Sequence, residues 1–140
     1  MKISARNQLK GTIKTVREGA VNGVVVICRH NHCPIKADIT MEAIRDLGLE
    51  EGKEATAIIK ASHVMFATGK IPSLSARNQI EGTVVKVAES AVNGHVTIET
   101  PEGDRITGSI TNEAIEDLGL KEGATAVAVI KASDVLVAVE

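Results

Sequence analysis

Two short polar runs carry the side chains of this chain that could do chemistry, and each run occurs twice. Ser4-Ala5-Arg6-Asn7-Gln8 returns unchanged as Ser75-Ala76-Arg77-Asn78-Gln79, an offset of 71 positions. Lys60-Ala61-Ser62 returns at the same offset as Lys131-Ala132-Ser133. Hydroxyl, guanidinium, ammonium and carboxamide groups are hydrogen-bond donors, and such small or polar residues are not expected to repeat for packing reasons. The two runs therefore predict a duplicated binding site.

The chemistry of the donors favours an anion that carries no protons. Ser4, Arg6, Thr40, Lys60 and Ser62 supply two cations and three hydroxyls, with no carboxylate among them. Thr40 stands where a helix N-cap is expected, and the unpaired N–H groups of a helix start favour negative charge. Charge-assisted hydrogen bonds of ~1.5–3 kcal/mol each could give micromolar binding after desolvation and ordering. A single Arg or Lys at a strand end is usually only solvated, so the repetition in register carries this interpretation.

The elements that must position these residues are mainly β-strands. In the first copy, strands are expected over 11–16, 24–28 and 55–64, with a turn at the Asn-Gly pair 22–23. A short helix is expected between its N-cap, Thr40, and Gly48. The second copy repeats the pattern, with a hairpin tip at 101–104 and a last strand over 126–139. About five strands and one short helix per copy predict two small OB-like β-barrels.

The repeat predicts two domains, over residues 1–68 and 75–140, joined by a linker over 69–74. A unit of about 65 residues buries only ~60% of the surface of its unfolded chain, so it gains stability from a partner. The apolar last strand of the second copy also favours an oligomer.

Composition argues against nucleic acid as a ligand. The 140 residues carry a net charge of −2, and Phe66 is the only aromatic residue, so there is neither a basic field nor a set of stacking platforms. The core must be built from Val, Ile, Leu and Ala. No stretch reads as a signal peptide or reaches the ~18 apolar residues of a membrane span. The expected location is the cytoplasm.

A run of motifs resembles the Mop domain of molybdate-binding proteins. It consists of Ser-Ala-Arg-Asn-Gln, Gly-Thr, Glu-x-Ala-Val-Asn-Gly, Ile-Thr, Leu-Gly-Leu-x-Glu-Gly and Ile-Lys-Ala-Ser-x-Val, and both copies match over nearly their whole length. The chain therefore resembles a tandem-Mop molbindin. The resemblance implies an OB-like barrel, a homotrimer of two-domain chains, and molybdate or tungstate bound at domain and subunit interfaces.

The resemblance also implies the ligands of the oxyanion, by matching the motifs of the family residue by residue. These are Ser4, Ala5, Arg6, Thr40, Lys60, Ala61 and Ser62 in the first copy, and Ser75, Ala76, Arg77, Thr111, Lys131, Ala132 and Ser133 in the second. Asn22 and Asn93 lie in the Val-Asn-Gly segment and could line a second type of site, although a turn already explains an Asn-Gly pair.

One hairpin departs from the family pattern. Cys28, His30, His32 and Cys33 stand where the second copy has a plain hairpin, and these residue types invite a zinc interpretation. Four ligands within six residues crowd a tetrahedral geometry, so an exposed polar hairpin is favoured and no metal site is assigned.

The leading functional interpretation is non-enzymatic intracellular binding of molybdate or tungstate for storage or homeostasis. Neither a nucleophile–base pair nor an acidic pair repeats, so no catalytic residue and no catalytic cofactor are expected. An oxyanion-sensing module that acts through a protein partner is the first alternative. OB-fold nucleic-acid binding is the second, and the composition disfavours it.

Overall fold

The structure, a computed structural model, describes residues 2–29 and 32–140, and only the backbone of His32 and Cys33. Strands dominate, as expected from the sequence. The elements of the first copy are β1 (Asn7–Arg17), β2 (Asn22–Arg29), β3 (His32–Thr40), α1 (Met41–Asp46), β4 (Glu54–Ile59), the 3₁₀ turn η1 (Ala61–His63) and β5 (Met65–Ala67). Those of the second copy are β6 (Asn78–Glu89), β7 (Asn93–Glu99), β8 (Arg105–Thr111), α2 (Asn112–Asp117), β9 (Thr125–Ile130), the 3₁₀ turn η2 (Ala132–Asp134) and β10 (Leu136–Ala138).

The structure forms two compact units, and the two copies of the repeat exchange their end segments between these units. Unit 1 comprises residues 1–59 and 131–140, and unit 2 comprises residues 60–130. The end of each copy therefore belongs to the unit built mainly from the other copy. The sequence repeat placed the boundaries at 68 and 75, so the compact units differ from that division by the exchanged segments.

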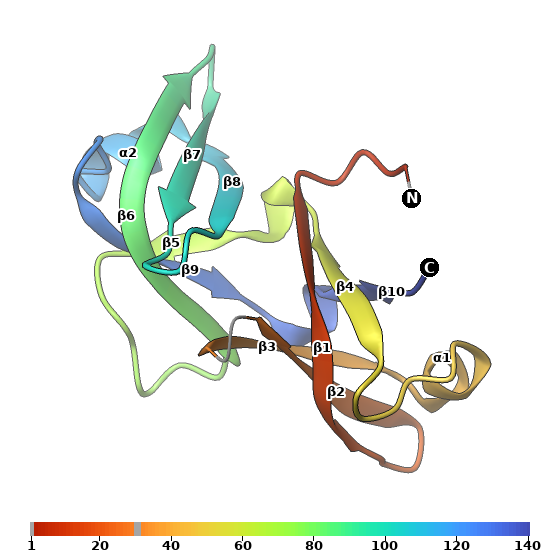
Figure 1. Cartoon of the computed structure of the whole chain (residues 1–140). Coiled ribbons are helices and arrows are strands. Elements are labelled where there is room, and N and C mark those ends of the chain that lie inside the picture. Colours follow the sequence, from red (N-terminus) through yellow and green to blue (C-terminus); the bar gives the residue numbers. More distant parts are fainter. Residues whose placement is uncertain (1, 30–31) are drawn as a thin grey trace. The chain divides into compact units, whose positions relative to one another are not determined.

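Each unit is one antiparallel five-stranded sheet. The strand order is β10-β4-β1-β2-β3 in unit 1 and β5-β9-β6-β7-β8 in unit 2. In Figure 1, β10 (dark blue) runs beside β4 (yellow), its ladder partner. At the other edge of the same sheet, β3 contacts both η2 and β10. The sheet thus curves back on itself into the expected OB-like barrel.

The last strand of each copy is shorter than expected. The sequence predicted continuous strands over 55–64 and 126–139, but β4 ends at Ile59 and β9 at Ile130. The 3₁₀ turns η1 and η2 follow, and after each turn the chain joins the other unit as β5 or β10. The strand prediction is wrong because an apolar β-branched run does not show where the chain leaves one sheet for another.

The expected turn between the first two strands of each copy is present, but it ends at the Asn of the Asn-Gly pair and the glycine already lies in the strand: Ser90 N donates to Asn93 O at 3.0 Å. Asn22 and Asn93 are the first residues of β2 and β7, and neither following glycine has a positive φ. A Cβ on Gly23 would lie 2.7 Å from Ile44 Cδ1 and 2.9 Å from Met41 Sδ. Glycine is used here because the helix packs closely on the strand, a constraint that turn statistics do not contain.

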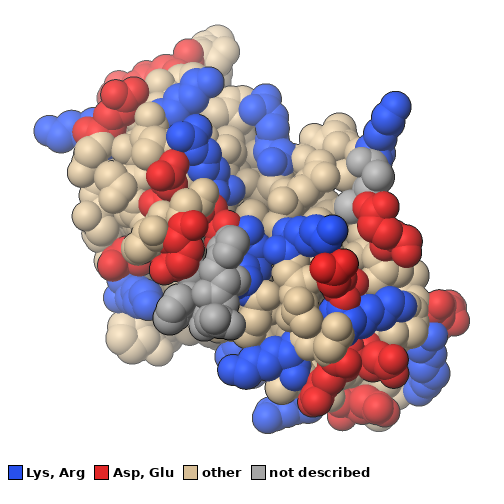
Figure 2. Space-filling model, viewed as in Figure 1, with Lys and Arg blue, Asp and Glu red and all other residues tan. Residues whose placement is uncertain are grey.

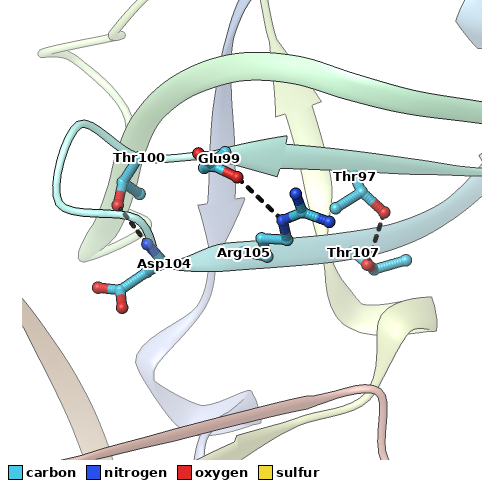
Figure 3. A network of polar contacts seen from close by, with 6 residues as sticks. All are labelled: Thr97, Glu99, Thr100, Asp104, Arg105 and Thr107. Atoms are coloured by element: carbon cyan, nitrogen blue, oxygen red, sulfur yellow. Dashed lines mark hydrogen bonds and ion pairs between the residues drawn. The ribbon is translucent and has the colours of Figure 1, made fainter.

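The short helices and the hairpin of the second copy agree with the sequence. Thr40 Oγ1 accepts a hydrogen bond from Ala43 N at 3.1 Å, and Thr111 does the same for Ala114, so both threonines are N-caps as expected. The β7–β8 hairpin turns between Thr100 and Asp104, with Gly103 at φ 94° (Figure 3). Figure 3 also shows the Arg105–Glu99 ion pair at 2.9 Å and the Thr97–Thr107 hydrogen bond at 2.8 Å.

Candidate functional site

The repeated five-residue run divides into a structural part and an exposed part. Asn7 and Asn78 are both only 2% exposed, and Asn7 Nδ2 donates to Ile59 O at 3.1 Å across the β1–β4 ladder. The expectation that no member of the run repeats for packing reasons is therefore wrong for the asparagine. The buried carboxamide of Asn7 links the first residue of β1 to the last residue of β4.

The glutamine of the run fixes the backbone that precedes each first strand. Gln8 Nε2 donates to Ala5 O at 3.1 Å and to Ile3 O at 3.3 Å. Gln79 donates to Ile71 O at 2.9 Å and accepts from Ile71 N at 2.7 Å. These bonds hold the backbone segment that carries the Ser-Ala-Arg triplet.

The Ser and Arg side chains of the same run face solvent. Ser4, Arg6, Ser75 and Arg77 are exposed, and the alanines between them are half-buried. Arg6 directly precedes Asn7, and Lys60 directly follows Ile59, the ladder partner of Asn7. In the second copy Arg77 and Lys131 flank the Asn78–Ile130 pair in the same way. The antiparallel ladder thus brings the beginning of each copy, with its Ser-Ala-Arg triplet, level with the strand end that precedes the Lys-Ala-Ser run of the same copy.

The exchange of end segments changes which residues share a unit. The turn η2 packs on β3, and η1 packs on β8. The sequence grouped Lys60 and Ser62 with Thr40, but the structure places both in unit 2. Each unit nevertheless contains one full complement of the candidate donors. Unit 1 holds Ser4, Ala5, Arg6, Thr40, Lys131, Ala132 and Ser133; unit 2 holds Ser75, Ala76, Arg77, Thr111, Lys60, Ala61 and Ser62.

The residues of the expected second site lie beside the N-caps. Asn22 pairs with Thr40 in the β2–β3 ladder, and Asn93 pairs with Thr111 in the β7–β8 ladder. All four residues are exposed. The threonine hydroxyl that accepts from the helix can still donate its own hydrogen. The structure therefore brings together, in each unit, an amide and a hydroxyl that the sequence analysis had assigned to different sites.

Other candidate features of the described residues do not fit an anion. A cavity of about 250 Å³ in unit 1 is lined partly by Lys10 and Lys53, but also by Glu54 and Glu140. Lys53 Nζ is engaged there as a donor to Leu47 O at 2.7 Å. Among the described residues no group of three His, Cys, Asp or Glu could hold a metal ion. His30 and the side chains of His32 and Cys33, on which the zinc interpretation rests, lie outside the described residues.

Comparison with known proteins places these features in a family context. The sequence profile of a family described as the TOBE domain matches residues 3–66 and 74–137. The molybdenum transport protein ModE of Herbaspirillum seropedicae is 44% identical over 141 residues, which cover 100% of this chain and 52% of that protein. The molybdenum-pterin-binding protein MopA of Rhodobacter capsulatus is 37% identical over 139 residues, covering 99% of this chain and 52% of MopA. The chain spans about half the length of these relatives.

A solved structure matches the chain over its whole length. It is a crystal structure of the cytoplasmic molybdate-binding protein ModG in a form with molybdate bound. The TM-score is 0.96 and the sequence identity is 46%, and the match covers 100% of both chains.

Proposed function

We propose, from the premise that the chain belongs to the TOBE domain family and carries two such domains in tandem, that it binds molybdate or tungstate without catalysing a reaction. The observation that carries the proposal is the full complement of exposed donors in each unit. ModG, which matches the chain over its whole length, is described as a molybdate-binding protein. The names of ModE and MopA also refer to molybdenum.

The candidate ligands fit a dianion better than they fit a reacting substrate. Each unit contributes one Arg, one Lys and three hydroxyl groups, all on exposed residues. Charge-assisted hydrogen bonds from such groups attract a tetrahedral oxyanion and offer it no acid or base. We assign these residues to oxyanion binding, and Asn22 and Asn93 to a weaker second type of site beside Thr40 and Thr111.

We further propose that the chain assembles as a homotrimer and that copies of the chain complete the sites. Large apolar side chains are exposed at equivalent positions of the two repeats, which is typical of surfaces that another copy covers. The equivalent pairs are Ile3 and Leu74, Val21 and Val92, and Met65 and Leu136. Val21 and Val92 are 74% and 70% exposed.

The proposed location is the cytoplasm, the location given for ModG. Within residues 2–29 and 32–140, no helix is long and apolar enough to cross a membrane. On the face shown in Figure 2, Lys and Arg side chains lie among Asp and Glu side chains and form no continuous basic surface. This charge pattern and the net charge of −2 support a small-anion ligand over nucleic acid.

A second candidate function is an oxyanion-sensing module that acts through a protein partner. The coverage of only 52% of ModE and MopA favours it, because in those relatives the matched region is joined to further sequence. Storage and sensing would use the same anion site. They differ in whether the anion-bound protein binds a protein partner.

Calorimetric titration of lysine variants tests the anion site. Lys60→Ala removes one cation from unit 2, and Lys131→Ala removes one from unit 1. Loss of one charge-assisted hydrogen bond should weaken molybdate binding by ~1.5–3 kcal/mol, roughly ten- to a hundred-fold. Each single variant should lose part of the stoichiometry, and the double variant nearly all of it.

The matched control is Lys14→Ala, because Lys14 is also an exposed strand lysine but belongs to neither run. It should bind molybdate like the parent. Melting curves without anion should be alike for all variants. Parent-like affinity and stoichiometry in the double variant would remove the Lys-Ala-Ser runs from the site.

A further inference from the structure

The backbone ladders of the two exchanged strands are interchangeable. In unit 2, β5 pairs Phe66 with Ala128 and Ala67 with Val127. In unit 1, β10 pairs Val137 with Ala57 and Ala138 with Thr56. Every residue of the second ladder is the repeat equivalent of one in the first, at an offset of 71. Backbone hydrogen bonding would therefore serve equally well if each end segment returned to its own repeat.

The side chains beneath these strands are not interchangeable. Phe66, the only aromatic residue of the chain, is equivalent to Val137. Gly108 in β8 is equivalent to Ala37 in β3, which is completely buried. Unit 2 thus combines the phenyl ring with the glycine, whereas unit 1 contains the valine and the alanine.

The contact in unit 2 leaves no room for a larger residue. A Cβ on Gly108 would lie 2.5 Å from Phe66 Cε2, 3.0 Å from Phe66 Cζ and 3.1 Å from Val64 Cβ. Phe66 is only 9% exposed, so its rigid ring cannot simply swing into solvent. Gly108 does not have a positive φ, so its backbone conformation does not require a glycine. A glycine is unfavourable in the middle of a strand, and here close packing is the reason for it.

We propose that Phe66 seated on Gly108 is the device that selects the exchanged arrangement. In the alternative, Phe66 would lie over the methyl group of Ala37, where the same geometry places a Cβ far inside van der Waals distance. Val137 would then lie over Gly108 and leave a void where the ring had been. Overpacking in one unit and underpacking in the other both disfavour the return of each end segment to its own repeat.

The selection has a consequence for the anion site, and this consequence rests on the proposed function. Lys60, Ala61 and Ser62 directly precede the Phe66 segment, so the ring commits that run to the unit of Ser75, Arg77 and Thr111. Phe66 and Gly108 are positioning residues and contact no anion in this scheme.

A competition between two disulfides tests the proposal without any anion. The parent for the test carries Cys28→Ser and Cys33→Ser, together with Ala67→Cys, Val127→Cys and Thr56→Cys. In the exchanged arrangement the thiol at 67 faces the thiol at 127; in the alternative it faces the thiol at 56, the partner of Ala138 in unit 1. Directly opposed residues of antiparallel strands lie within disulfide range.

Oxidised glutathione serves as oxidant, accepting the two electrons as two protein thiols become one disulfide and two molecules of glutathione are released. Peptide mass spectrometry then gives the ratio of the two products. Linkage within a chain or between chains counts alike, because the pairing of segments is what is measured. The 67–127 product should exceed the 67–56 product by at least about tenfold.

Two sets of substitutions move the selecting contact. Ala37→Gly with Gly108→Ala keeps the composition but provides the glycine in the repeat that contains Phe66, and should reverse the ratio to favour 67–56 by about tenfold. Phe66→Val with Gly108→Ala copies the residues of unit 1 into unit 2. It should fold like the parent and bring the ratio to within about threefold of unity.

A parent-like ratio in either variant would overturn the proposal. Gly108→Ala alone provides the packing control, since Phe66 then has no glycine to cover in either repeat. Its melting temperature should fall by roughly 5–15 °C, and Phe66→Val should restore most of it. A fall with no restoration would show that the ring and the glycine are not a complementary pair. Molybdate titrations are judged separately: both copies supply the same types of donor, so each unit keeps a full complement in either arrangement. A failure to bind molybdate would therefore count against the proposed function and not against the selection by Phe66.

Discussion

Replacing Asn7 by Ala tests the division of the repeated run into buried and exposed parts. Asn7 is 2% exposed, and its carboxamide donates to the carbonyl of Ile59, a residue that is completely buried. Without the donor, that carbonyl loses a partner in a place that water does not reach. A buried polar group left unsatisfied costs about 1–3 kcal/mol, and the space left by the carboxamide adds a packing loss. We expect Asn7→Ala to lower the free energy of unfolding by about 2–4 kcal/mol.

The loss should be large beside the total stability of a small domain, which is typically about 5–15 kcal/mol. Urea unfolding followed by far-UV circular dichroism is the suitable assay, because the chain contains neither Trp nor Tyr. The matched variant is Arg6→Ala, one position earlier and exposed. It should unfold like the parent but bind molybdate more weakly. Equal stability of the Asn7 and Arg6 variants would refute the buried role of the asparagine.

Three further outcomes are expected from other parts of the molecule. Thr111→Ala removes the acceptor for Ala114 N and should cost about 0.5–2 kcal/mol in urea unfolding, while Thr111→Ser should cost much less. Gly94→Ala puts a Cβ 2.7 Å from Ile115 Cδ1 and 2.9 Å from the carbonyl of Ala88, and should cost about 1–3 kcal/mol; a neutral result would contradict the close packing of α2 on β7. Sulfate, a smaller dianion, should bind more weakly than molybdate in calorimetry, and an affinity within a few-fold would argue against a site fitted to the larger tetrahedron.

Local features of the fold could be predicted because local physical chemistry determines them. Thr40 and Thr111 are good N-caps in any short helix, and both cap one here. The turn residues at 101–104 predicted the hairpin tip that the structure shows. The aliphatic composition predicted a core of Val, Ile, Leu and Ala, and these residue types make up most of the buried side chains, with Met41 and Phe66 added to them.

The features that could not be predicted depend on contacts distant in the sequence. Asn-Gly is a strong turn signal, but Gly23 serves the approach of Ile44 and Met41, which come about twenty residues later. The role of Asn7 likewise depends on Ile59, its ladder partner. Polarity alone suggested a ligand, and only the register of β1 and β4 shows that the carboxamide is buried between them.

The exchange of end segments was hidden by the same symmetry that made the repeat visible. Equivalent positions carry similar residues, so each end segment fits the sheet of either repeat as far as periodicity and propensity can show. Information on the pairing can reside only in positions where the two copies differ and where the differing residues touch. Phe66 and Gly108 are such positions, with Val137 and Ala37 as their equivalents, and a lone aromatic residue together with an unmatched strand glycine is what the sequence shows of them. In this tandem repeat, the positions that differ between the copies, and not those that they share, therefore hold the information on which segments build each unit.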